Sequence, residues 1–125
     1  MSKRRINNST LELLDGENNA VLSVFEFLRG ETMVIGLKGQ IRNEIAHDLG
    51  DEIDAASFAC ESLEVDMGGV TYIAGLGLET LCRVKREIDE ADGTEMILTN
   101  VSEAVAARLR ESGYAGRIDI NGVNG

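Results

Sequence analysis

Metal ligands and aromatic side chains are scarce in this sequence, and their scarcity limits the chemistry that the protein can perform. The 125 residues include one histidine, two cysteines and no tryptophan, and aromatic residues make up 4% of the chain. A zinc or iron site needs more histidine or cysteine ligands than are present, and cofactor pockets are usually lined by aromatic side chains. The single histidine, His47, lies among acidic residues and is interpreted as a surface side chain. We therefore expect no metal, no cofactor and no catalytic residue, and hence a protein that is not an enzyme.

Basic residues and long apolar runs are also lacking. Twelve lysine and arginine residues stand against 22 aspartate and glutamate residues, which gives a formal net charge of −10. A field of this sign repels nucleic-acid phosphates and anionic membrane surfaces. No apolar run approaches the ~20 residues that span a bilayer, and residues 1–10 hold no apolar segment of a secretory signal. The sequence therefore predicts a cytoplasmic protein that neither binds nucleic acid nor inserts into a membrane.

The two cysteines are predicted to be structural. Cys60 and Cys82 lie among apolar residues in segments that we expect to be helical. Thiols stay reduced in the cytoplasm, and no Cys-x-x-Cys pair is present for metal binding or redox chemistry. Both residues are therefore expected to be reduced and packed in the interior.

Hydrophobic patterns divide the chain into a polar N-terminal part and one α/β domain. Residues 1–19 are predicted to be a partly flexible tail, and the domain is expected to span 20–122. Period-two and helical spacings predict strands at 20–28, 32–37, 62–67, 95–99 and 117–120, and helices at about 43–60, 75–91 and 103–112. The order β-β-α-β-α-β-α-β requires parallel pairing with helical crossovers after an initial hairpin. The sequence thus predicts a mixed β-sheet flanked by helices.

Glycines mark several loops and helices of this domain. Gly50 lies inside the first helix and, at a cost of about 1 kcal/mol relative to alanine, is expected to weaken it. Gly68 and Gly69 precede the second helix, which begins around 75–77, and none of these glycines fits the Gly-x-Gly-x-x-Gly nucleotide-binding pattern. The free N–H groups of this helix start could hold an anion, so a small-molecule or nucleotide site is one interpretation. The other is that the glycines let the backbone pass close to the sheet.

One ungapped stretch carries a family resemblance. Residues 65–78 read Val-Asp-Met-Gly-Gly-Val-Thr-Tyr-Ile-Ala-Gly-Leu-Gly-Leu, which resembles the signature of STAS domains, the anti-sigma-factor antagonist family. The segment 34–41 resembles the family's strand that ends in Gly-Glu-hydrophobic-Asp, and 96–114 resembles a later strand and helix. The resemblance covers about 21–120, and the predicted order of elements is the STAS order. It implies a single STAS domain.

The resemblance implies a role in partner switching. An antagonist of this family binds an anti-sigma factor, usually a serine kinase with a GHKL-type ATPase fold, which phosphorylates a serine at the start of the second helix. The added charge of about −1.5 to −2 breaks the complex. Here that serine falls on Gly75 in the ungapped match, or on Ile73 when the match is shifted by two residues. Neither residue has a hydroxyl group, so no phosphorylation is expected at the motif position, and Thr71 and Thr80 are the nearby substitutes.

A partner-binding surface is expected to persist without this serine. It is predicted to comprise Gln40, Arg42, Asn43, Ala74, Gly75, Leu76, Gly77, Glu79 and Arg83. Arg42 stands where many antagonists carry aspartate. We expect an antagonist-like regulator whose partner is an anti-sigma factor or a GHKL-type serine kinase. The alternative is a scaffold or accessory STAS subunit of a larger assembly, either a signalling complex or a lipid-transport ATPase, and a homodimer is a further option.

Overall fold

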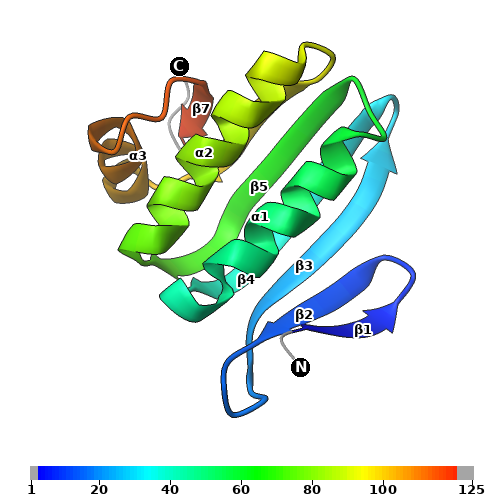
Figure 1. The fold of residues 1–125 in the computed structure, drawn as a ribbon, viewed down its shortest axis with the longest axis vertical. Helices are drawn as coiled ribbons and strands as arrows, with labels where there is room; N and C mark the ends of the chain where they lie inside the picture. Colours follow the sequence, from blue (N-terminus) through cyan, green and yellow to red (C-terminus); the bar gives the residue numbers. More distant parts are fainter. Residues whose placement is uncertain (1–2, 121–125) are drawn as a thin grey trace.

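Short turns and helical crossovers organise residues 3–120, the part of the chain that the computed structural model describes, into one seven-stranded sheet with helices packed against it (Figure 1). The strands lie in the sheet in the order in which they occur along the chain. The elements are β1 (Lys3–Asn7), β2 (Thr10–Leu14), β3 (Ala20–Arg29), β4 (Thr32–Ile41), α1 (Asn43–Ser57), β5 (Ser62–Ile73), α2 (Gly75–Ala91), β6 (Glu95–Val101), α3 (Glu103–Glu111) and β7 (Arg117–Ile120). This mixed α/β architecture confirms the predicted fold class, with β1 and β2 as two strands that were not predicted.

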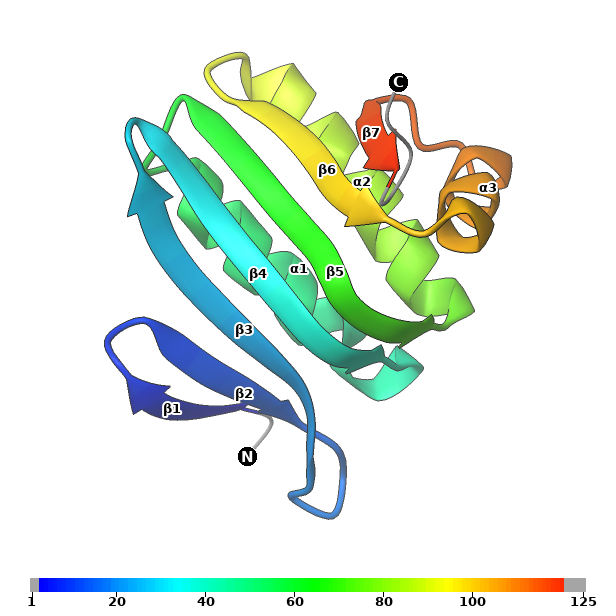
Figure 2. The same ribbon diagram turned by 180° about the vertical axis from the view of Figure 1, so that it is seen from behind.

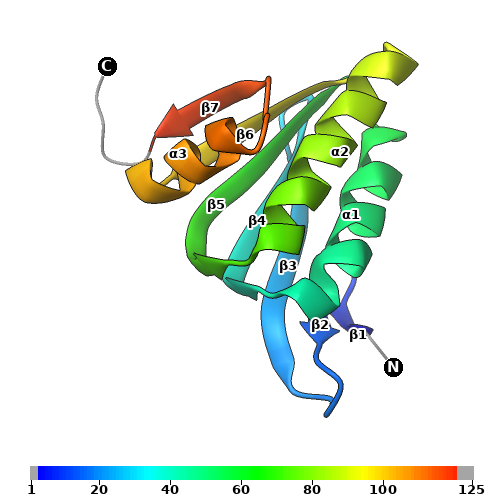
Figure 3. The ribbon, with the colours of Figure 1, turned by 60° about the vertical axis from the view of Figure 1, so that its left-hand side comes forward.

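Strand pairing changes direction at β4. Strands β1 to β4 pair antiparallel, and the tight turn between β3 and β4 contains Gly30 at φ 64°. Strands β4 to β7 pair parallel, because a helix carries the chain back across the sheet after β4, β5 and β6. Helices α1 and α2 consequently begin at the same end of the sheet and lie side by side on one of its faces (Figure 3). Seen from behind, β3, β4 and β5 have no helix in front of them (Figure 2).

Residues 3–14 form a hairpin of the sheet, so the prediction of a tail over 1–19 is wrong for this part of the chain. Strand β1 pairs with β2, and β2 pairs with β3. Leu11 and Leu13 point into the core and are 2% and 0% exposed. Lys3 Nζ on β1 lies 2.9 Å from Glu52 Oε2 on α1. Two leucines around a glutamate are a strand pattern, but the polar residues on both sides obscured it in the sequence.

Strand β5 is longer than predicted, because it continues to Ile73 where a loop was expected over 68–73. A Cβ atom on Gly69 would lie 2.7 Å from the Leu37 carbonyl oxygen of β4. Glycine at this position lets β5 stay paired with β4 through an irregular stretch of the register. The interpretation that glycines bring the backbone close to the sheet is therefore correct for Gly69.

The core lies between the sheet and the two long helices. Helix α1 contributes three fully buried residues at the predicted four-residue spacing: Ile45, Leu49 and Ile53. A Cβ atom on Gly50 would lie 2.9 Å from both Thr80 Cγ2 and Arg83 Nη2 on α2. The missing side chain lets the two helices pack closely, and α1 runs unbroken from Asn43 to Ser57. Gly50 therefore has a packing role between α1 and α2, and its expected cost to the stability of α1 stays a prediction.

The two cysteines occupy different positions. Cys82 lies in α2 and is 3% exposed. Cys60 was also predicted to be helical, but it follows the end of α1 and lies outside any helix. Both are free thiols. Burial raises the pKa of each thiol above its ordinary value, which disfavours the reactive thiolate.

Replacing Leu13 by alanine is expected to lower the free energy of unfolding by about 2–5 kcal/mol, because the substitution leaves a cavity under the N-terminal hairpin. Ile6 on β1, which is 52% exposed, provides the matched control, and Ile6→Ala is expected to change the same free energy by less than about 0.5 kcal/mol. Urea unfolding followed by circular dichroism measures both variants. If Leu13→Ala and Ile6→Ala had the same free energy of unfolding, the hairpin would not unfold together with the rest of the domain.

Candidate functional site

Two strand-to-helix turns meet at one end of the sheet. Strand β4 ends at Ile41 and β5 ends at Ile73, and these two residues are paired. Arg42 and Ala74 follow them in an extended conformation and are the N-cap residues of α1 and α2. The Ala74 N–H donates a hydrogen bond to the Ile41 carbonyl oxygen at 2.8 Å, which holds the turns together. Because α/β folds commonly bind ligands at the carboxyl ends of their parallel strands, this end is the candidate site.

Asn43, at the start of α1, caps the neighbouring helix. Its Oδ1 accepts a hydrogen bond from the Leu76 N–H at 3.1 Å, whereas Ala74, the N-cap of α2, makes no side-chain cap. The first N–H groups of a helix lack partners within the helix. Asn43 therefore fixes the start of α2 relative to the start of α1, a role that the sequence did not predict.

The two glycines at the start of α2 have opposite environments. Gly75 is exposed, and a Cβ atom built on it would meet no other atom within 4 Å. Gly77 is buried, and a Cβ atom on it would lie 2.6 Å from Ile41 Cγ2 and 3.1 Å from Ile73 Cγ1. Ala74, at 5% exposed, also faces inward. Gly75 thus forms an accessible rim, while Gly77 and Ala74 pack beneath it and are not part of the exposed surface.

Polar contacts hold the turn between β4 and α1. Arg42 Nε donates a hydrogen bond to Gln40 Oε1 at 2.7 Å, and Arg42 Nη1 lies 3.8 Å from Asp15 Oδ2 in the turn between β2 and β3. Hydrogen bonds from the backbone N–H groups of Asn19 and Glu17 hold the pKa of Asp15 below its ordinary value, and Arg42 acts in the same direction. The ionised Asp15 therefore helps to fix the positive charge of Arg42 at the border of the site.

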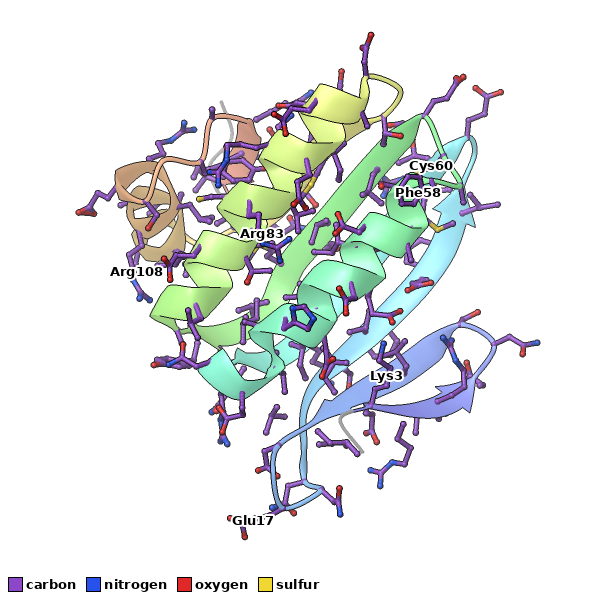
Figure 4. All side chains as sticks on the ribbon, viewed as in Figure 1. Lys3, Glu17, Phe58, Cys60, Arg83 and Arg108 are labelled. Carbon is purple, nitrogen blue, oxygen red and sulfur yellow. The ribbon has the colours of Figure 1, made fainter. Side chains whose placement is uncertain are left out.

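An open groove runs between the first turns of α1 and α2. Its lining consists of Asn43, Ala46, His47, Leu76, Glu79, Thr80, Arg83 and Arg86. Arg83 lies between the two helices (Figure 4), and its Nη1 donates a hydrogen bond to Glu87 Oε1 at 3.0 Å. His47 is exposed, with its Nε2 3.4 Å from Asp51 Oδ2. A groove of this open form suits a side chain of another protein better than a small molecule, which binds in enclosed pockets.

Two residues at this end were not predicted from the sequence. Tyr72 on β5 is 51% exposed and pairs with Gln40 of β4. The sequence could have identified Tyr72, because it occupies the aromatic position of the STAS-like motif at 65–78. Arg108 on α3 (Figure 4) donates from Nη1 to the Ile73 carbonyl oxygen at 2.6 Å. No sequence signal pointed to this contact, because it joins residues 35 positions apart.

The two threonines that were considered as phosphate acceptors are poorly placed. Thr80 is 7% exposed. Thr71 is exposed, but it lies within β5 and its Oγ1 donates a hydrogen bond to the Gly39 carbonyl oxygen at 3.2 Å. Neither threonine presents a free hydroxyl group at the start of α2.

Metal-binding clusters and membrane-crossing helices do not occur in the described part of the chain. Among residues 3–120, no group of three or more histidine, cysteine, aspartate or glutamate side chains is arranged to hold a metal ion. Over the same residues, no helix combines the length and the apolar character that crossing a bilayer requires.

The sequence matches one protein family, and the fold is similar to several solved structures. Residues 26–121 match the protein family described as "Mlab, STAS domain". The fold is similar to that of the anti-sigma factor antagonist SpoIIAA in its unphosphorylated form, at 18% identity and a TM-score of 0.61, over 76% of this chain and 86% of that one. It is also similar to an anti-sigma factor antagonist from Mycobacterium paratuberculosis, at 15% identity and a TM-score of 0.64, over 86% and 90% of the two chains. A chain of the stressosome, described as a signal integration and transduction hub, is similar at 19% identity and a TM-score of 0.57, over 77% and 87%. No curated protein matches the sequence significantly.

Gly77→Ala is expected to lower the free energy of unfolding by about 1–3 kcal/mol, because the added methyl group would overlap Ile41. Gly75→Ala is the matched control. The same change in open space is expected to be neutral or to stabilise the protein by up to about 1 kcal/mol. Thermal unfolding measures both variants. A similar loss of stability in the two would contradict the distinction between a packed and an exposed glycine.

Proposed function

This chain belongs to the STAS domain family, and from that premise we propose that it is a non-enzymatic regulatory domain that acts in the cytoplasm by binding a protein partner. The proposed docking surface consists of Gln40, Arg42, Asn43, Tyr72, Gly75, Leu76, Glu79 and Arg83. The observation that carries the proposal is the exposed Gly75, around which a partner finds open space at the start of α2. A position without a side chain allows another protein to approach the helix backbone closely.

The proposed partner is an anti-sigma factor or a GHKL-type serine kinase. Membership of the family supports this class, and two similar solved structures are described as anti-sigma factor antagonists. The proposed surface combines exposed apolar residues with polar groups, as protein interfaces do. Tyr72 and Leu76 supply exposed apolar area and are 51% and 50% exposed, while Arg42 and Glu79 supply polar and charged groups at the border.

Phosphorylation at the motif position has no part in this proposal. Gly75 has no hydroxyl group, and Ile73, the position in the shifted match, is 1% exposed. Thr71 and Thr80 are bonded or buried as described above. The domain would therefore remain in the form that binds its partner, and its effect would follow the abundance of that partner.

A second candidate function is that of a scaffold or accessory subunit in a larger assembly, such as a signalling complex or a lipid-transport ATPase. The similarity to a chain of the stressosome favours it, and so does a docking surface without a phosphate acceptor, because a permanent subunit needs no release step. The identity of the protein bound at Gly75 distinguishes the two functions. An anti-sigma factor or a GHKL-type kinase supports the first, and an assembly subunit or a transport ATPase supports the second.

Gly75→Asp is expected to weaken partner binding at least tenfold, which corresponds to about 1.4 kcal/mol, because it adds a charged side chain at the proposed contact. Gly93→Asp is the matched control, since Gly93 also has open space around it and follows the other end of α2. The partner is first captured from the native cytoplasm with the wild-type protein. Its purified form is then titrated with the wild type and each variant by calorimetry. Ala107→Asp, on the exposed side of α3, adds the same charge outside the end of α2 and serves as a second control. Equal affinities of Gly75→Asp and Ala107→Asp would place the interface elsewhere.

Gly75→Ser is expected to create a phosphate acceptor that the wild-type protein lacks. If the captured partner is a kinase, labelled ATP should transfer phosphate to the serine variant and leave the wild-type protein unlabelled. Open space around position 75 means that the variant should fold normally. Mass spectrometry locates the label. Phosphate on Thr71 or Thr80 of the wild-type protein would contradict the proposed absence of phosphorylation.

A further inference from the structure

A large apolar side chain is exposed at the end of the helix pair opposite to Gly75. Phe58 directly follows α1 and is 87% exposed, more than any other exposed large hydrophobic residue among 3–120. Figure 4 shows Phe58 and Cys60 at this far end of α1. Burying a phenylalanine side chain is worth about 1.5–3 kcal/mol, so a fully exposed one is a ready anchor for a partner.

An apolar groove lies beside Phe58. Ile88 and Ala91 of α2 line it on one side, and Ser57, Phe58 and Cys60 line it on the other. Its shape is held by Thr94, whose Oγ1 is within hydrogen-bond distance of the carbonyl oxygens of Ser57 and Cys60, at 2.8 and 2.6 Å. These contacts hold the segment that follows α1 against the segment that follows α2. The groove is therefore already formed in the unbound protein.

The surroundings of this groove are strongly acidic. Asp54, Glu61 and Glu87 line it. Glu87 pairs with Arg83, whereas neither Asp54 nor Glu61 has an ion-pair partner among residues 3–120. Burial raises the pKa of Asp54 above its ordinary value; the neighbouring Glu87 and Asp51 act in the same direction, and Arg83 acts against them.

The helix ends add to this negative field. The carbonyl groups at the C-termini of α1 and α2 carry partial negative charge, and neither helix has a basic residue in its last turn, whereas α3 has Arg108 and Arg110. Two uncompensated helix ends and a group of carboxylates therefore face the same groove. Cations are the groups that such a field attracts.

We infer that this end of the molecule is a second docking surface, which binds a basic segment of another protein by taking an apolar side chain between Phe58 and Ile88 and placing lysine or arginine residues against the acidic rim. A second copy of this chain would oppose its own acidic residues at such an interface. Anionic lipid headgroups would be repelled for the same reason. Charge complementarity thus favours a basic protein segment.

This surface is separate from the one proposed at Gly75. Helix α2 has 17 residues and therefore separates the two ends by about 25 Å. The inference does not rest on the proposed function, and a partner bound at one end leaves the other end accessible.

The test uses the full chain, labelled with ¹⁵N, and two synthetic probe peptides with the same helical spacing of leucines. One peptide carries lysines between the leucines and the other carries glutamates. The lysine peptide is expected to shift the amide signals of residues 54–61 and 87–95, with an affinity that falls as salt is added. Equal binding of the glutamate peptide, or shifts centred on Gly75, would overturn the inference.

Two pairs of variants test whether Phe58 and Glu61 bind the lysine peptide themselves. In each pair, the control makes a similar change elsewhere on the surface. Phe58→Ala is expected to weaken binding of the lysine peptide at least tenfold, and Ile6→Ala, which truncates an exposed apolar residue on β1, less than twofold. Glu61→Lys is expected to weaken it at least fivefold, and Glu44→Lys, with the same change of net charge at the start of α1, less than twofold. Equal effects within either pair would refute a localised surface.

Sedimentation velocity of the wild type and of Phe58→Ala tests the competing occupant. The wild-type protein is expected to show no self-association that depends on Phe58. A dimer that Phe58→Ala dissociates would overturn the inference in favour of a second copy. Binding at the Gly75 end has its own readout in Gly75→Asp, so the failure of one proposal leaves the other measurable.

Discussion

The packing of the first turn of α2 against the ends of β4 and β5 is the constraint on which the candidate site depends. Gly77 lies so close to Ile41 and Ile73 that a side chain there would displace one of them. The hydrogen bond from the Ala74 N–H to the Ile41 carbonyl oxygen fixes the same point of the chain. These contacts set where α2 begins, and they thereby set where Gly75 reaches the surface. The position of the proposed docking surface therefore follows from the core packing beneath it.

The parallel arrangement of α1 and α2 gives the molecule two unlike ends. Both helices follow parallel strands, so their dipoles point in the same direction. The end at Gly75 gathers helix N–H groups and Arg42, and Asn43 supplies the cap that Ala74 does not. The other end gathers helix carbonyl groups, carboxylates and the exposed Phe58. A domain with two such surfaces can bring two proteins together without changing its own structure.

Local sequence patterns were sufficient for the three helices and for the order of the elements from β3 onward. The spacing of apolar residues identified α1, α2 and α3, and the local sequence also caps α3, where Ser102 Oγ accepts a hydrogen bond from the Val105 N–H at 3.2 Å. The same patterns failed for β1 and β2, which are short and flanked by polar residues, and for the second half of β5, where glycines indicated a loop. In these places pairing with a neighbouring strand outweighed local preference. The limits 20–122 for the STAS domain stay a prediction.

The sequence by itself determined the family, the order of the elements from β3 onward and the absence of a hydroxyl group at position 75, because these depend only on which residues occur and how they are spaced. Only the tertiary structure decided that Gly75 is exposed while Gly77 is packed. It also decided that Asn43 caps the neighbouring helix and that Arg108 reaches the end of β5. These last two contacts join residues 33 and 35 positions apart, and no local pattern specifies which distant groups the folded chain brings within hydrogen-bond distance.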